Sequence, residues 1–165
     1  MRPRRIQPND GRRLKEVRLR ALLTDPDAFG ASYEDTASHG EDHWEERATA
    51  AASGNEQFIA LAEDGGRVVG MVGAYTPEDA SHLRHLVSTW VAPEARGRGL
   101  GSELVVSVVE WARTTSASEL TLWVVDGNRP AIALYERSGF VPTGEKQPLP
   151  SNPSLVESLM SLSLG

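Results

Sequence analysis

Three glycines alternate at positions 97, 99 and 101, between an apolar, strand-like stretch and a helix-like stretch. Gly97, Gly99 and Gly101 permit positive φ and carry no Cβ that would keep a ligand away from the main chain. Backbone N–H groups at a helix start have no partner within the helix, and the helix dipole adds positive potential there. The junction therefore predicts an anion site suited to a phosphate, with Arg96 and Arg98 supplying charge at its rim.

Length and composition favour one domain over residues 1–165, because 165 residues with 39% hydrophobic content can enclose a sizeable core. No apolar run approaches the roughly 20 residues of a membrane span, and the start Met1–Arg5 lacks the apolar stretch of a secretory signal. We therefore expect a cytoplasmic protein with no membrane partner. The absence of cysteine excludes disulfides, a thiol nucleophile and a cysteine-based metal site, and we expect no metal.

The net charge of −6 argues against nucleic acid as a partner, because such binding depends on a basic face. The charge is unevenly distributed, since eight Lys or Arg residues fall among the first twenty positions and acidic residues gather between Glu34 and Glu46. The acidic run has two interpretations. It is either a solvated helix face or an attraction for a cationic substrate.

The first half of the chain predicts two helices followed by a set of antiparallel strands. The expected elements are a short strand at 4–6, a helix at 10–23 that Asp10 can cap, a loop-like stretch at 29–36, a helix at 42–52, and strands at 57–62, 67–75 and 82–91. The turn residues Glu63–Gly66 indicate that the strands around them form a hairpin.

The second half predicts alternating helices and strands. The expected elements are a helix at 100–114, a strand at 120–125, a helix at 129–137, a strand that starts at 140–141, an irregular proline-rich loop at 142–153, and a closing strand at 155–164. The helix at 100–114 has a wide apolar face and should lie across the sheet.

Two segments, Val91–Gly101 and Asn128–Phe140, carry sequence patterns that resemble those of a known family, the GNAT superfamily of N-acetyltransferases. Val91–Gly101 looks like the acyl-CoA signature Arg/Gln-x-x-Gly-x-Gly/Ala, matched at positions 96, 99 and 101. Asn128–Phe140 is similar to the family pattern Asn-x-x-Ala-x-x-x-Tyr-x-x-x-Gly-Phe and follows at the expected distance. Residues 26–36 also resemble a weaker pattern seen in many members. The two main signatures in this order are more specific than either one alone.

The resemblance implies an α/β (α+β) GNAT-like acyl-CoA N-acyltransferase fold, with a mixed, mainly antiparallel sheet of six or seven strands and about four helices. It also implies acetyl-CoA as the acyl donor, with its pantetheine beside the strand that ends at Val91. In the family that strand diverges from the next one, often at a β-bulge, and the imperfect alternation of 82–91 allows a bulge near Ser88–Thr89. The residues expected to contact the cofactor are Trp90, Val91, Arg96, Gly97, Arg98, Gly99, Leu100, Gly101, Ser102, Asn128 and Tyr135.

The implied reaction is attack of a neutral amine on the bound thioester, and it needs an oxyanion donor, a partner for the leaving thiolate and a base. A backbone N–H of the diverging strand could stabilise the oxyanion. Tyr135 matches the family tyrosine that hydrogen-bonds the CoA sulfur. A phenol has a pKa of ~10 and a thiol one of ~8.5, so a hydrogen bond to the thiolate suits Tyr135 better than full proton transfer. A structural role in the core, against Leu134 and Phe140, is the alternative.

The general base is left open by the sequence. Some family members place a glutamate on the strand before the glycine loop, but 82–91 holds no carboxylate. His85 on that strand is one candidate, because an imidazole titrates near ~6.5. Glu34 is another, on the analogy that the loop between the first two helices lines the acceptor site. A chain of water molecules is a third route, and Asp126 reads as a turn residue.

Two other functions compete with the transferase. A dinucleotide-binding oxidoreductase is disfavoured because Ser102 breaks the Gly-x-Gly-x-x-Gly pattern. A non-catalytic acyl-CoA-binding or sensing module would keep the cofactor cleft and lose turnover. For the transferase we expect a small-molecule amine, a protein N-terminus or a lysine as acceptor. The acceptor would be cationic if the acidic run attracts it. A homodimer through the strand at 155–164 is possible.

Overall fold

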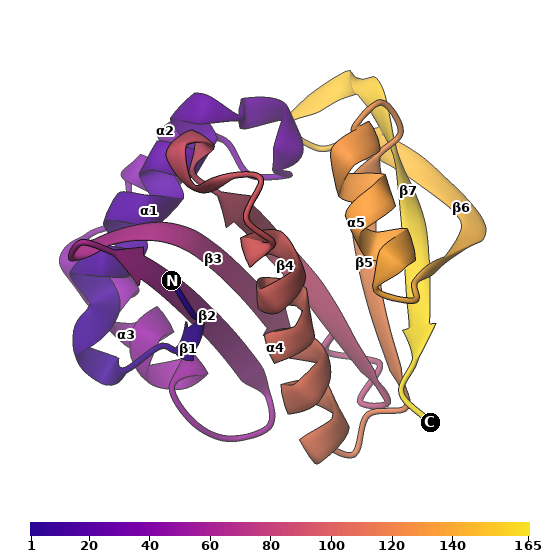
Figure 1. Ribbon diagram of the computed structural model, residues 1–165, viewed down its shortest axis with the longest axis horizontal. Coiled ribbons are helices and arrows are strands. Elements are labelled where there is room, and N and C mark those ends of the chain that lie inside the picture. The colour runs from indigo at the N-terminus through magenta and orange to yellow at the C-terminus, as the bar shows by residue number, and fades with distance from the viewer.

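Seven strands form one sheet in the computed structural model, which describes residues 1–165 (Figure 1). Their order is β1-β2-β3-β4-β5-β7-β6, and every neighbouring pair is antiparallel except β4 and β5. The strands are β1 (Arg4–Arg5), β2 (Gln57–Asp64), β3 (Arg67–Tyr75), β4 (Leu83–Val91), β5 (Glu119–Val125), β6 (Val141–Leu149) and β7 (Asn152–Ser163). The expected mixed, mainly antiparallel sheet is confirmed.

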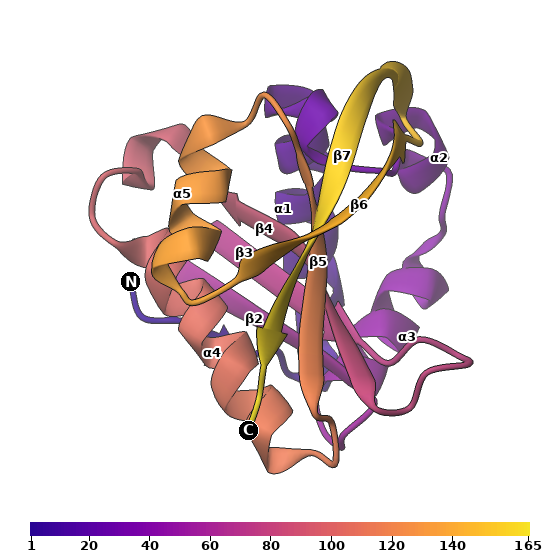
Figure 2. The same ribbon diagram turned by 90° about the vertical axis from the view of Figure 1, so that its right-hand side faces the viewer.

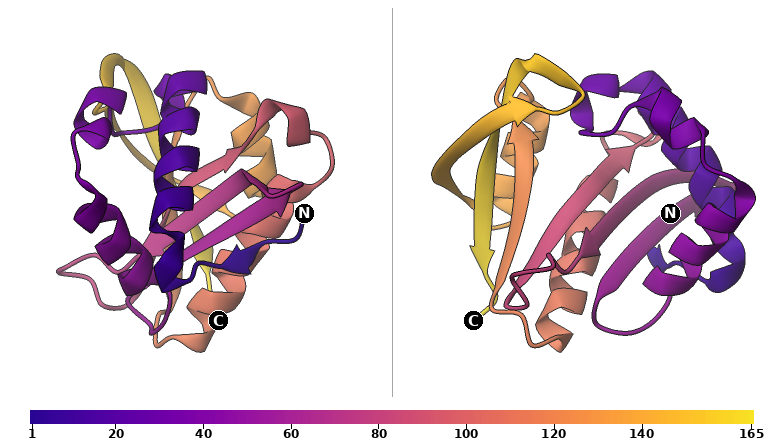
Figure 3. Two further views of the ribbon diagram at one scale, coloured as in Figure 1. Left: turned by 90° about the vertical axis from the view of Figure 1, so that its left-hand side faces the viewer. Right: turned by 180° about the vertical axis from the view of Figure 1, so that it is seen from behind.

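Helices cover both faces of this sheet (Figures 2 and 3). Helices α1 and α3 pack against each other and on β2 and β3, whereas α4 lies on the opposite face and contacts β2, β3, β4 and α5. The helices are α1 (Gly11–Thr24), α2 (Tyr33–Ala37), α3 (Glu41–Ala51), α4 (Leu100–Thr114) and α5 (Arg129–Arg137). None of them is both long and apolar enough to cross a membrane.

Helix α4 anchors the glycine segment to the core. Its inward face is fully buried at Leu100 and Leu104 and continues to Val108, as the apolar spacing predicts. Gly70 of β3 makes the close packing possible, because a Cβ there would come within 3.1 Å of the Leu100 side chain. Burying each such side chain contributes roughly 1.5–3 kcal/mol. The start of α4 is therefore held rigidly against the sheet.

Strand β4 is bulged on one side and loses its neighbour on the other. Opposite β3, the pairing steps from Gly73–Val87 to Met71–Trp90, so β4 carries one extra residue between the two pairs. Ser88 lies at this point with φ +61°, and it is the only residue other than glycine with positive φ. Opposite β5, pairing covers only residues 83–85 of β4. A bulge is thus present at the place where the alternation allowed one, and the two parallel strands are no longer paired after His85.

Five α-helices are present where about four were expected, because the loop-like stretch at 29–36 contains the start of α2. The Ser32 side chain accepts a hydrogen bond from Asp35 N and so caps this short helix. The prediction of an irregular loop at 142–153 is wrong, because most of this segment forms β6 and the turn into β7. Strand β6 is at the edge of the sheet, where prolines such as Pro142 and Pro148 are tolerated.

Asp10 occupies the N-cap position of α1, but its side chain does not cap the helix. The carboxylate is buried and accepts hydrogen bonds from both terminal nitrogens of Arg4, from Arg13 and from Gln7 N. These bonds hold the pKa of Asp10 below its usual value, with the Arg4 bond as the largest cause. Asp10 therefore ties β1 to α1.

Candidate functional site

A cleft of about 470 Å³ lies where β4 has left β5, between the start of α4 and α5. Its lining includes most of the residues that the two sequence signatures contribute. From the glycine segment and α5 these are Arg96, Gly97, Gly99, Leu100, Gly101, Ser102, Asn128, Leu134 and Tyr135, and from β4 they are Thr89, Trp90 and Val91. The fold thus assembles in one cleft segments that are about forty residues apart in the chain.

The glycine loop presents free main-chain donors to this cleft. Gly97 and Gly99 have φ of +80° and +81°, and Gly99 is the N-cap of α4 with no side-chain hydrogen bond to the first turn. The N–H groups of that turn therefore have no partner in the helix. A Cβ built at Gly97 or Gly99 meets no protein atom within 4 Å, whereas at Gly101 it would come within 3.2 Å of Leu134. The loop leaves open space for an anion, and Gly101 allows α4 and α5 to approach.

The two arginines of the loop differ in position. Arg96 lines the cleft, but its guanidinium donates to Val91 O at 2.9 Å and to Asp25 Oδ2 at 2.8 Å. The same Asp25 oxygen accepts from Trp90 Nε1 at 2.8 Å, so Asp25 fastens the loop to β4. Arg98 does not line the cleft, and its guanidinium donates to Glu94 O. Sequence reasoning missed Asp25, which follows the helix expected at 10–23 and precedes a proline.

Asn128 and Tyr135 lie on the α5 side of the cleft. Asn128 Oδ1 accepts from Ala131 N at 3.3 Å and caps α5, which orients the helix that carries Tyr135. Tyr135 is 7% exposed and packs edge-on against Phe140. Burial raises the pKa of Tyr135, and the adjacent Thr89 hydroxyl opposes that effect, so the phenol stays protonated at neutral pH. Tyr135 is therefore both a core residue and a protonated donor in the cleft.

Neither sequence-based candidate for the general base lines the cleft. His85 lies where β4 still pairs with β5, its Nδ1 is 2.9 Å from Thr121 Oγ1, and burial lowers its pKa to about 4. Its imidazole is therefore neutral at pH 7 but only weakly basic. Glu34 is exposed on α2. Asp126, read as a turn residue, forms an ion pair with Lys146.

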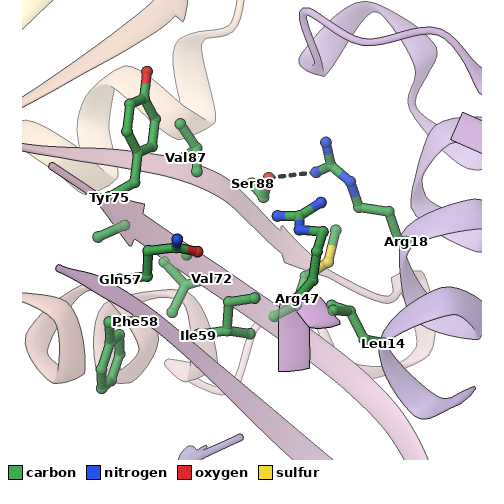
Figure 4. A pocket seen from close by; sticks show the side chains of 13 residues that line it. Leu14, Arg18, Arg47, Gln57, Phe58, Ile59, Val72, Tyr75, Val87 and Ser88 are labelled. Atoms are coloured by element: carbon green, nitrogen blue, oxygen red, sulfur yellow. Dashed lines mark hydrogen bonds between the residues drawn. The ribbon is translucent and has the colours of Figure 1, made fainter. Parts of the chain in front are cut away.

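A second, smaller cavity of about 50 Å³ lies on the other face of the sheet, below α1 and α3 (Figure 4). Arg18 of α1 and Arg47 of α3 both point into it, and Arg18 donates a hydrogen bond to Ser88 Oγ. Ser88 lines this cavity, whereas the next residue, Thr89, lines the cofactor cleft. Sequence reasoning missed both arginines, although Arg18 follows Leu14 by one helical turn and so belongs to the buried face of α1.

Comparison with known sequences identifies the class of protein to which this fold belongs. A family model described as "Acetyltransferase (GNAT) family" matches residues 18–140. Since that match covers most of the 165 residues, the chain belongs to the GNAT acetyltransferase family. The resemblance that the two signatures carry is thereby confirmed.

Relatives and solved structures agree with this assignment. A mycothiol acetyltransferase from Pseudarthrobacter chlorophenolicus is 28% identical over 127 residues, which are 75% of this chain and 37% of that protein. The chain thus spans less than half the length of this relative. An acetyltransferase of the GNAT family from Streptococcus pneumoniae superposes with a TM-score of 0.84 at 25% identity, covering 99% of this chain and 98% of that one.

A structure of phosphinothricin acetyltransferase from Sinorhizobium meliloti in complex with AcCoA also shares the fold. It superposes with a TM-score of 0.79 at 22% identity and covers 99% of this chain and 88% of that one.

Proposed function

We propose that the chain transfers the acetyl group of acetyl-CoA to an amine by direct attack on the bound thioester. The observation that carries this proposal is the glycine loop, whose left-handed Gly97 and Gly99 leave the first-turn N–H groups of α4 facing an open cleft. A diphosphate is the anion that such a cradle suits best. Family membership and the AcCoA complex of a structural neighbour support the same donor.

The separation of β4 from β5 gives the rest of the donor a place. Beyond His85, β4 has no ladder partner on β5, so its main-chain groups on that side are free to bond the amide groups of a pantetheine arm. The thioester would then lie beside the bulge at Ser88 and Thr89. A backbone N–H at that bulge is in the right region to stabilise the oxyanion of the tetrahedral intermediate.

The chemical step follows from these positions. The amine nitrogen forms a bond to the carbonyl carbon, the C–S bond breaks, and the CoA thiolate leaves beside Tyr135. The Tyr135 phenol, kept protonated by burial, donates a hydrogen bond to that thiolate. The acceptor ammonium must lose a proton to become the neutral amine that attacks. Because neither His85 nor Glu34 lines the cleft, we assign the acceptance of that proton to water rather than to a single essential side chain.

Release of free thiol from acetyl-CoA, measured with a thiol-reactive dye against a panel of amines, tests the proposal. The proposal requires release that depends on the amine and that falls in Tyr135→Phe. Tyr33→Phe is a matched control, because Tyr33 is exposed on α2 and does not line the cleft or the smaller cavity. Binding of acetyl-CoA without thiol release from any amine would replace the transferase with the sensing module.

Other expectations stay predictions. One domain over residues 1–165 and a cytoplasmic location are inferred from composition alone. A homodimer through β7 would have to cover Val156, which is 43% exposed. The cationic acceptor expected from the acidic run also stays a prediction, and the exposed position of Glu34 and Asp35 gives it no support.

A further inference from the structure

Two arginines share the small cavity beneath the bulge without any counter-ion. Arg18 and Arg47 are its only charged lining residues. None of the seven ion pairs in the structure includes either of them. Arg18 Nε is buried with no hydrogen-bond partner. Figure 4 shows both arginine side chains among the residues that line this cavity.

This arrangement is unfavourable for the empty protein. Burial lowers the pKa of Arg18 to about 10, with the nearby charge of Arg47 as a second cause, and burial also lowers the pKa of Arg47. Two like charges that are partly shielded from water cost stability unless something neutralises them. A bound anion would supply the missing partner, and a guanidinium binds a carboxylate through two parallel hydrogen bonds.

The cavity is placed where an acceptor could reach the thioester. Ser88 faces the cavity and Thr89 faces the cofactor cleft, and the Cα atoms of consecutive residues are only about 3.8 Å apart. For comparison with the size of this cavity, a site that holds one water molecule needs roughly 10–15 Å³. The volume of about 50 Å³ therefore suits a small charged group rather than a whole substrate.

Resting on the proposed transferase function, we infer that the acceptor is an amine that also carries a carboxylate, and that Arg18 and Arg47 bind this carboxylate. The Ser88 hydroxyl positions Arg18 through their hydrogen bond. The amine end of the acceptor then projects across the bulge toward the acetyl group. The acidic residues of α3, such as Glu45 and Glu46, are exposed and line a different surface, which fits a solvated helix face.

A panel of α-amino acids tests this inference when each is paired with its carboxamide and its decarboxylated amine. Thiol release from acetyl-CoA gives KM and kcat for each member. We expect the carboxylate forms to have the lowest KM. Arg18→Gln and Arg47→Gln should each raise the KM for the carboxylate form roughly 10- to 100-fold, the range expected for losing hydrogen bonds to a charged group, and leave the carboxamide KM unchanged.

Arg12→Gln is the matched control, because Arg12 is an exposed arginine of α1 that does not line the cavity. The affinity of all three variants for acetyl-CoA should equal that of the wild type. Without acceptor, Arg47→Gln should melt at the same or a higher temperature than the wild type, since it removes an unpaired cation. A purely structural arginine would give a lower melting temperature instead.

Equal KM values for the carboxylate, carboxamide and decarboxylated forms, or a carboxylate KM that is unchanged in both cavity variants, would overturn the inference while the transferase stands. If no amine releases thiol, the proposed function fails, and titration of N-acetylated amino acids and their carboxamides into the CoA-saturated protein decides the inference. Carboxylate-specific binding that Arg18→Gln and Arg47→Gln abolish would then support it, and its absence would refute it.

Discussion

Gly99→Ala separates the backbone strain of the glycine loop from its role in binding. Gly99 has φ +81° and forms the N-cap of α4. An L-residue in this left-handed conformation costs about 1–2 kcal/mol, and since no protein atom lies within 4 Å of the new Cβ, no steric cost is added. We therefore expect Gly99→Ala to lower the free energy of unfolding by about 1–2 kcal/mol and to fold normally.

The same change should weaken cofactor binding much more than it weakens the fold. A diphosphate that rests on the glycine loop would compete with the new Cβ for the open space at Gly99, and its hydrogen bonds to the first-turn N–H groups would weaken. Hydrogen bonds to a charged group contribute about 1.5–3 kcal/mol each, so the loss of one corresponds to roughly a 10- to 100-fold increase in Kd. Chemical denaturation measures the stability, and calorimetric titration with CoA measures the affinity.

Gly66→Ala is the matched control. Gly66 lies in the turn between β2 and β3, remote from the cleft, and it has φ +82° with no protein atom within 4 Å of a built Cβ. It should lose the same stability as Gly99→Ala and bind CoA like the wild type. If Gly99→Ala also binds CoA like the wild type, the glycine loop does not hold the diphosphate and the reasoning from main-chain donors is wrong.

Three further changes test other parts of the account. Tyr135→Phe should lower kcat roughly 10- to 100-fold with little change in acetyl-CoA affinity, since it removes one hydrogen bond to the leaving thiolate; a wild-type kcat would leave Tyr135 a core residue only. Burial lowers the pKa of His85 to about 4 in the folded chain. As the pH falls, the His85 imidazole therefore takes up its proton at a higher pH in the unfolded chain than in the folded one, which favours unfolding. Stability should therefore drop by at most about 3 kcal/mol between pH 6.5 and pH 4, and His85→Gln should flatten that pH profile in urea titrations. Asp10→Asn should destabilise the fold by about 2–3 kcal/mol, measured in the same way, because it weakens the bonds from Arg4 and Arg13; an unchanged midpoint would contradict that role.

The cofactor side of the site could be predicted from the sequence because its chemistry depends on local backbone. Glycine at positions 97 and 99 indicates a left-handed backbone, which both residues have. The spacing of apolar residues in α4 predicts which face of that helix is buried. The signature around Tyr135 places α5 beside the same turn. The imperfect alternation along β4 only allowed a bulge near Ser88, and the structure shows one there.

The acceptor side could not be predicted in the same way because it depends on contacts between distant segments. Arg18 and Arg47 meet only once α1 and α3 have packed on the sheet, and neither residue stands out in a chain with many surface arginines. The position of His85, next to Thr121 rather than in the cleft, depends likewise on the register between β4 and β5. The start of edge strand β6 was expected at 140–141, but its continuation to Leu149 was missed because its prolines predict a loop unless the sheet order is known.

Calorimetric titration of acetyl-CoA into the intact, folded chain tests the central claim most directly. The account predicts saturable binding of one acetyl-CoA per chain that weakens in Gly99→Ala and not in Gly66→Ala. Absence of any binding heat at millimolar acetyl-CoA, from protein whose circular dichroism shows the folded state, would contradict it.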